Sequence, residues 1–179
     1  MERAVTEWMV EHGHPTTNNQ KTFNDCRHIG TLPFDNYVEI GIYDIFIEND
    51  GYQHTDKDAH FNRNDGDFSS ILRRDLIKTH YVISKHTNTP RKRVLLRIAY
   101  PEAKNIETIL DNIQQQALNG TLQQGLHCFG HIDNPDVATV YNVHQRITTK
   151  TTTHDLNCLH ILLELKTGLV APWELVFED

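Results

Sequence analysis

Acidic and imidazole side chains gather early in the chain, at Asp35, Glu48, Asp50 and His54. Two carboxylates with a nearby backbone carbonyl form a hard oxygen site suited to Mg²⁺ or Mn²⁺. Such an ion can lower the pKa of a bound water and stabilise the charge of a phosphodiester transition state. A neutral imidazole near that water can act as a general base, and a protonated one can contact phosphate. These residue types indicate metal-dependent hydrolysis, with Asp35 and Glu48 as the expected ligands.

A β-hairpin is predicted around Gly41. β-rich runs over residues 37–40 and 42–48 flank this glycine, a pattern typical of two antiparallel strands. The run Asn49-Asp50-Gly51 has the residues of a turn, so the second strand is expected to end there.

This hairpin would bring the acids together. Asp35 stands at the entry to the first strand and Glu48 at the exit of the second, so antiparallel pairing would place the two carboxylates side by side. Asp50 would share a strand face with Glu48 because side chains alternate along a strand. His54 would lie in the following turn, within reach of the same site.

Helices and a buried strand are predicted around the hairpin. Apolar residues at helical spacing, including Val5, Trp8 and Met9, predict a helix over residues 2–12, followed by a polar loop through Asn24. After the hairpin, the predicted elements are a polar loop over residues 55–68, a helix from Ser69 that carries Asp75 and Lys78, a buried strand over residues 94–98, and a helix capped by Asn105 that ends at Asn119-Gly120. The sequence pattern over residues 121–179 does not decide between strands and helices.

Five segments stand in a fixed order along the chain: Phe23-Asn24-Asp25-Cys26-Arg27, Leu32-Pro33-Phe34-Asp35, Ile47-Glu48-Asn49-Asp50-Gly51-Tyr52-Gln53-His54, Asp75-Leu76-Ile77-Lys78 and Leu96-Arg97-Ile98-Ala99-Tyr100. This order resembles a group of nucleases related to the very-short-patch-repair endonuclease, within the wider PD-(D/E)xK superfamily, found among phage and large-virus proteins and homing endonucleases. The resemblance spans roughly residues 2–113. It implies an α/β (α+β) fold of the restriction-endonuclease-like kind, with a mixed central sheet flanked by helices, and Mg²⁺-dependent cleavage of DNA.

The resemblance also implies roles for individual residues. Its helical glutamate corresponds to Glu2, its motif acid to Asp35 and its strand acid to Glu48. Asp50 and His54 match the family's "DG..H" element. The superfamily usually has a lysine two residues after the strand acid, and Asp50 replaces it here, which leaves His54 or Lys78 to assist the attacking water. Asn49 also departs from the aromatic or aliphatic residue usual in this group.

Seven basic residues are expected to contact DNA phosphates: Arg73, Arg74, Lys78, Arg91, Lys92, Arg93 and Arg97. Each has a simpler interpretation as well. Lys78 and Asp75 could form an ion pair on a helix surface. The cluster over residues 91–93 could be a solvated loop. Arg97 could be a charge at a strand edge, or it could anchor Glu2.

The composition is that of an ordinary globular protein, with one nuclease core expected over residues 1–119 and an extension of unknown role over residues 120–179. A net charge of -7 argues against a protein that coats DNA in bulk and requires a local basic surface. No apolar run is long enough for a membrane span. Three widely spaced cysteines and a start without an apolar leader predict an intracellular protein, in the cytoplasm or in the nucleoid or nucleus of a host cell. A homodimer is compatible with double-strand cleavage.

Two other functions fit the sequence. A nuclease fold that has lost catalysis could serve as a binding or assembly module, which the acidic charge favours. Alternatively, a small interaction protein could be stabilised by zinc through the late cysteines and histidines, which are Cys128, Cys158, His127, His131 and His160. Their spacings are not those of common zinc motifs, so ordinary core or surface positions are the simpler interpretation.

Overall fold

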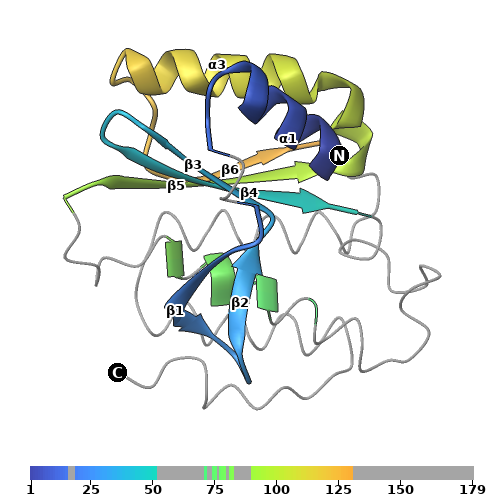
Figure 1. Ribbon diagram of the computed structural model, residues 1–179, viewed down its shortest axis with the longest axis vertical. Helices are drawn as coiled ribbons and strands as arrows, with labels where there is room; N and C mark the ends of the chain where they lie inside the picture. The colour runs from blue at the N-terminus through green and yellow to red at the C-terminus, as the bar shows by residue number, and fades with distance from the viewer. Residues whose placement is uncertain are drawn as a thin grey trace.

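A mixed β-sheet is the central element of the computed structural model (Figure 1). The structure describes residues 1–15, 19–51, 71, 74, 75, 77–79, 81, 82 and 90–130. Within these residues the sheet order is β3 (Asn36–Ile40), β4 (Tyr43–Asp50), β5 (Lys92–Ala99) and β6 (Gly125–Phe129). β3 runs antiparallel to β4, whereas β4 runs parallel to β5 and β5 runs parallel to β6. The predicted α/β class, with a mixed sheet flanked by helices, is confirmed.

The predicted hairpin is present as β3 and β4. Its register pairs Asn36 with Ile47, and Gly41 takes the positive φ of 55° that the turn requires. The predicted turn after Glu48 is wrong, because Asn49 and Asp50 continue β4 and pair with the end of β5. Ladder pairing with a neighbouring strand has overridden the turn preference of these residues.

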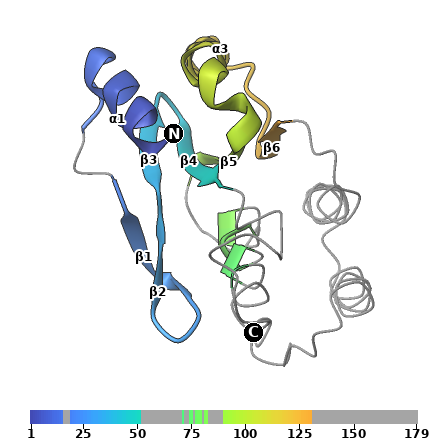
Figure 2. The ribbon, with the colours of Figure 1, turned by 90° about the vertical axis from the view of Figure 1, so that its right-hand side faces the viewer.

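Two helices cover one face of the sheet (Figure 2). α1 (Glu2–Glu11) buries Val5, Trp8 and Met9, as the helical spacing predicted. α3 (Ile106–Leu118) packs its buried residues into the same core. It follows a 3-10 helix, η3 (Tyr100–Asn105). Asn105 precedes α3 as predicted, but its side chain makes no capping hydrogen bond and donates to Glu102 instead.

A second hairpin lies on the other face (Figure 2). A cluster of aromatic side chains packs there as well. β1 (Lys21–Arg27) pairs with β2 (Thr31–Phe34), so the predicted polar loop through Asn24 is wrong in this part. Phe23 and Cys26 point toward the core, and the two polar residues between them are exposed. This segment therefore lacks the regular alternation of apolar and polar residues that would have predicted a strand. The aromatic side chains packed here are Phe23, Phe34, Tyr37, Phe46 and Tyr81.

The sheet continues beyond the expected end of the core at residue 119. β6 was not predicted, and it pairs with β5 from Val94 opposite Gly125 to Ile98 opposite Phe129. None of the helices in the part of the chain that the structure describes is both long and apolar enough to cross a membrane. The loop over residues 55–68 and most of the expected extension, which includes the zinc candidates His131, Cys158 and His160, lie outside the described residues.

Candidate functional site

Charged side chains meet on the aromatic face at the carboxyl end of β4. Glu48 and Asp50 alternate with Asn49, so they lie on the same side of the strand as Phe46. Parallel pairing places Arg97 of β5 directly opposite Glu48. All three charged side chains are buried, so each needs a partner to offset the cost of leaving water.

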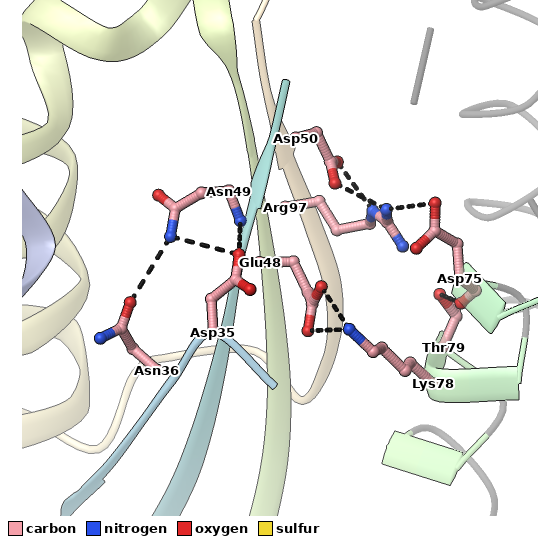
Figure 3. A network of polar contacts seen from close by, with 9 residues as sticks. All are labelled: Asp35, Asn36, Glu48, Asn49, Asp50, Asp75, Lys78, Thr79 and Arg97. Atoms are coloured by element: carbon pink, nitrogen blue, oxygen red, sulfur yellow. Dashed lines mark hydrogen bonds and ion pairs between the residues drawn. The ribbon is translucent and has the colours of Figure 1, made fainter. Parts of the chain in front are cut away.

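Lys78 is the partner of Glu48. Its Nζ donates to both carboxylate oxygens, at 3.0 Å to Oε1 and 2.8 Å to Oε2 (Figure 3). The exposed fraction is 3% for the Glu48 side chain and 11% for that of Lys78, so the contact is largely shielded from water. The Lys78 ammonium also lies 5.5 Å from the centre of the Phe34 ring. The alternative interpretation of Lys78 and Asp75 as a surface ion pair does not describe these contacts, because Lys78 pairs with Glu48 of β4 and Asp75 with Arg97 of β5.

Asp35 lies beside Glu48 at the edge of the sheet. It directly precedes β3, and the register continues so that position 35 stands opposite position 48. The backbone N–H of Asn49 donates to Oδ2 of Asp35 at 2.8 Å, which holds this carboxylate against β4. The side chain of Asn36 accepts from Asn49 (Figure 3). It also donates to Asn19, which extends the polar network away from Glu48.

The surroundings of Glu48 favour its protonated form. Burial raises the pKa of Glu48 to about 8, and the negative charge of Asp35 acts in the same direction. The positive charges of Lys78 and Arg97 lower this pKa and offset part of the effect of burial. A strongly shifted carboxyl group beside a second carboxylate and a lysine is a combination that occurs at functional sites.

Arg97 and Asp50 form a second ion pair next to the first. Nε and Nη2 of Arg97 donate to the two carboxylate oxygens of Asp50, at 2.8 and 2.7 Å. Asp75 lies on the other side of the same guanidinium, with its Oδ2 3.0 Å from Nη2. The Asp50 carboxylate therefore pairs with Arg97 rather than pointing toward Asp35.

A divalent ion would have to use Asp35 and Glu48. Among the residues that the structure describes, no group of three or more His, Cys, Asp or Glu side chains is arranged to hold a metal. Mg²⁺ binds through one or two carboxylates and keeps several waters, so a pair of acids meets its requirement. A structural zinc needs four nitrogen or sulfur ligands. His127 instead contacts the backbone carbonyl of Gln123, and Cys128 lies close to Arg97 and Asp50.

The structure places most of the other predicted site residues elsewhere. Glu2 is exposed on α1, and α1 covers the opposite face of the sheet from Glu48. Arg74 is exposed and helical, next to Asp75. His54 and Arg73 lie outside the described residues.

The basic residues of β5 do not form a DNA-facing surface at the acids. Arg97 is buried in its two ion pairs, and Arg93 is buried against Tyr81 and Phe46, so both guanidinium groups face protein atoms, and their phosphate contacts stay predictions. Arg91 and Lys92 lie at the amino end of β5, the opposite end from Glu48. Arg91 pairs there with Asp44 and Glu39.

The contacts of the Asn36 and Asn49 side chains and the pairing of Arg97 with Asp50 and Asp75 were not predicted. The available signal was an arginine within an apolar run, because such a residue requires an acidic partner when the strand is buried. Its partner depends on the register between β4 and β5, which the sequence does not specify. Comparison of the chain with the models of known protein families, with curated proteins and with solved structures gave no match.

Proposed function

We propose that the chain is a metal-dependent endonuclease that hydrolyses DNA phosphodiester bonds on a restriction-endonuclease-like fold. The observation that carries this proposal is the buried contact of Lys78 with Glu48, next to Asp35, at the carboxyl end of a sheet strand. The resemblance led us to expect the two acids, with His54 or Lys78 in place of the superfamily lysine that Asp50 replaces. Here the lysine comes from a helical segment rather than from the strand itself.

Each group has a distinct task in this proposal. Asp35 and Glu48 would hold Mg²⁺ or Mn²⁺, which when bound would supply positive charge to stabilise the phosphate in the transition state. Asn49 fixes the Asp35 carboxylate through its backbone N–H. Lys78 neutralises Glu48 when no cation is bound and can turn its ammonium toward a phosphate oxygen when one is. The DNA approaches the carboxyl end of β4, where Arg74 is exposed.

Metal binding is expected to depend strongly on pH. Because the pKa of Glu48 is raised to about 8, its carboxyl group must lose a proton before it can bind a cation at lower pH. The affinity for Mn²⁺ should therefore rise about tenfold for each pH unit below this pKa and become constant above it. Titration calorimetry with Mn²⁺ in buffers of different ionisation enthalpy measures both the affinity and the released proton. An affinity that is unchanged between acidic and alkaline buffers would contradict the assignment of Glu48.

The proposed activity is tested by incubating the purified chain with supercoiled plasmid DNA. We expect nicked plasmid to accumulate with Mg²⁺ or Mn²⁺, and EDTA to stop the reaction. Restoring excess Mg²⁺ to the same sample should restart it, which separates metal removal from loss of the fold. Nicking that persists in EDTA, or intact plasmid at high enzyme concentration with either metal, would overturn the proposal.

A binding or assembly module without catalysis is the second candidate. The observation that favours it is that Lys78 already satisfies both carboxylate oxygens of Glu48 and so occupies the place of a cation. Such a protein would show no saturable Mn²⁺ site by calorimetry and would leave plasmid DNA intact. A saturable site with nicking supports the endonuclease instead.

A further inference from the structure

One guanidinium joins two buried carboxylates from separate elements of the fold. Arg97 of β5 forms a two-point contact with Asp50 of β4 and a further ion pair with Asp75 of the helical segment (Figure 3). The exposed fractions of these side chains are 3% for Arg97, 1% for Asp50 and 5% for Asp75. A planar guanidinium can face two carboxylates at fixed angles, which a lysine cannot do.

The same helical segment carries Lys78. Asp75 lies three residues before Lys78, and the hydroxyl of Thr79 donates to the Asp75 carbonyl at 2.8 Å, as expected within a helical turn. Residues three apart on a helix lie on the same side, so Asp75 and Lys78 both face the sheet. Each contacts a different strand, since Asp75 meets Arg97 and Lys78 meets Glu48. Parallel register places those two strand residues directly opposite each other.

Stability alone does not account for this arrangement. Buried ion pairs of this kind contribute little more to folding than apolar residues of similar volume would, because the charges lose their hydration. Their geometry is demanding, however, and fixes the relative position of the groups that carry them. Asp50 holds the guanidinium through two hydrogen bonds, and Asp75 pairs with Nη2 of the same group.

We infer that Arg97 is a positioning residue, which holds the helical residues Asp75 and Lys78 against the sheet so that the Lys78 ammonium meets Glu48. The importance of this positioning for catalysis rests on the proposed function, but the placement of Lys78 can be measured without any assay of activity. Loss of either arm of the Arg97 contact should release Lys78 from Glu48 while the sheet, which is held by its own ladder and core, stays folded.

The placement is tested by NMR of the full chain labelled with ¹⁵N at lysine side chains. An ammonium group held in a shielded ion pair gives an observable side-chain signal, whereas an exposed one exchanges its protons with water too fast. The signal is assigned to Lys78 by its disappearance in Lys78→Met. We expect it to disappear also in Asp75→Asn and in Arg97→Lys, each checked for folding by its backbone spectrum. Asp111→Asn is the matched control, because it removes the charge of a carboxylate that contacts Trp8 and His12 on the opposite face and should leave the signal unchanged.

Kinetics adds a second readout. Loss of a residue that orients a functional side chain costs about 10- to 100-fold in activity. The kcat of Asp75→Asn and of Arg97→Lys should therefore fall by that factor, with little change in KM for plasmid DNA. Combining Asp75→Asn with Lys78→Met should reduce kcat no further than Lys78→Met alone.

A Lys78 signal that persists in folded Asp75→Asn or Arg97→Lys would overturn the inference. Should Asp75→Asn fail to fold, Arg97→Lys decides alone. Loss of the signal in a chain whose wild type does not nick DNA would uphold the positioning role and reject the proposed function.

Discussion

Replacing Glu48 with glutamine is expected to reduce Mg²⁺-dependent nicking of plasmid DNA by roughly 1,000-fold or more. Glutamine has nearly the same volume as glutamate and can still accept a hydrogen bond from Lys78, so the site keeps its packing. It carries no negative charge, and a cation then has Asp35 as its remaining acidic ligand. A bound metal ion supplies several kcal/mol of transition-state stabilisation, and a loss of about 4 kcal/mol corresponds to a factor of about 1,000 in rate.

Glu39→Gln is the matched control for this substitution. Glu39 lies on β3 at the other end of the hairpin, where it contacts Tyr37 and Arg91 and its side chain is more than half exposed. Its replacement should leave the nicking rate unchanged. Glu48→Gln should also weaken Mn²⁺ binding, and adding Asp35→Asn should remove it. Activity that survives in the combined Asp35→Asn and Glu48→Gln variant would exclude this pair as the metal site.

The hairpin and the neighbourhood of Asp35 and Glu48 could be predicted because their signals are local. β-rich runs around Gly41 specify antiparallel strands with a short turn, and antiparallel pairing then places the first residue of one strand near the last of the other. The apolar run over residues 94–98 likewise indicated a buried strand, and it is the middle of β5. Helix α1 followed from the spacing of three apolar residues.

The ion pairs around these acids could not be predicted because they depend on contacts between distant segments. Parallel strands require a long crossover connection, so nothing local indicates that Arg97 stands opposite Glu48 rather than one residue away. A shift by one residue would point the arginine to the helical core and leave Glu48 with a different neighbour. The same uncertainty made Arg93 and Arg97 look like exposed basic residues, although both are buried. β6 was missed for a related reason, since its five residues gain strand structure from pairing with β5.

Replacing Arg97 with methionine is expected to destabilise the fold by about 3–5 kcal/mol, because removal of one partner from a buried ion pair leaves an uncompensated charge. Here two carboxylates, Asp50 and Asp75, would remain buried without the guanidinium that faces them both. A small domain is stable by only about 5–15 kcal/mol, so this loss would be a large share of the total. Urea denaturation at neutral pH measures the free energy of unfolding of the wild type and of the variant.

Two further variants separate the charge effect from loss of packing. Adding Asp50→Asn and Asp75→Asn to Arg97→Met removes the stranded charges, so the triple variant should be more stable than the single one despite carrying more substitutions. Arg91→Met is the control at the other end of β5, where Arg91 is about one third exposed and its loss should cost less. Equal losses for Arg91→Met and Arg97→Met, or a triple variant weaker than the single one, would mean that Arg97 stabilises the fold through its packed side chain rather than by joining the two acids.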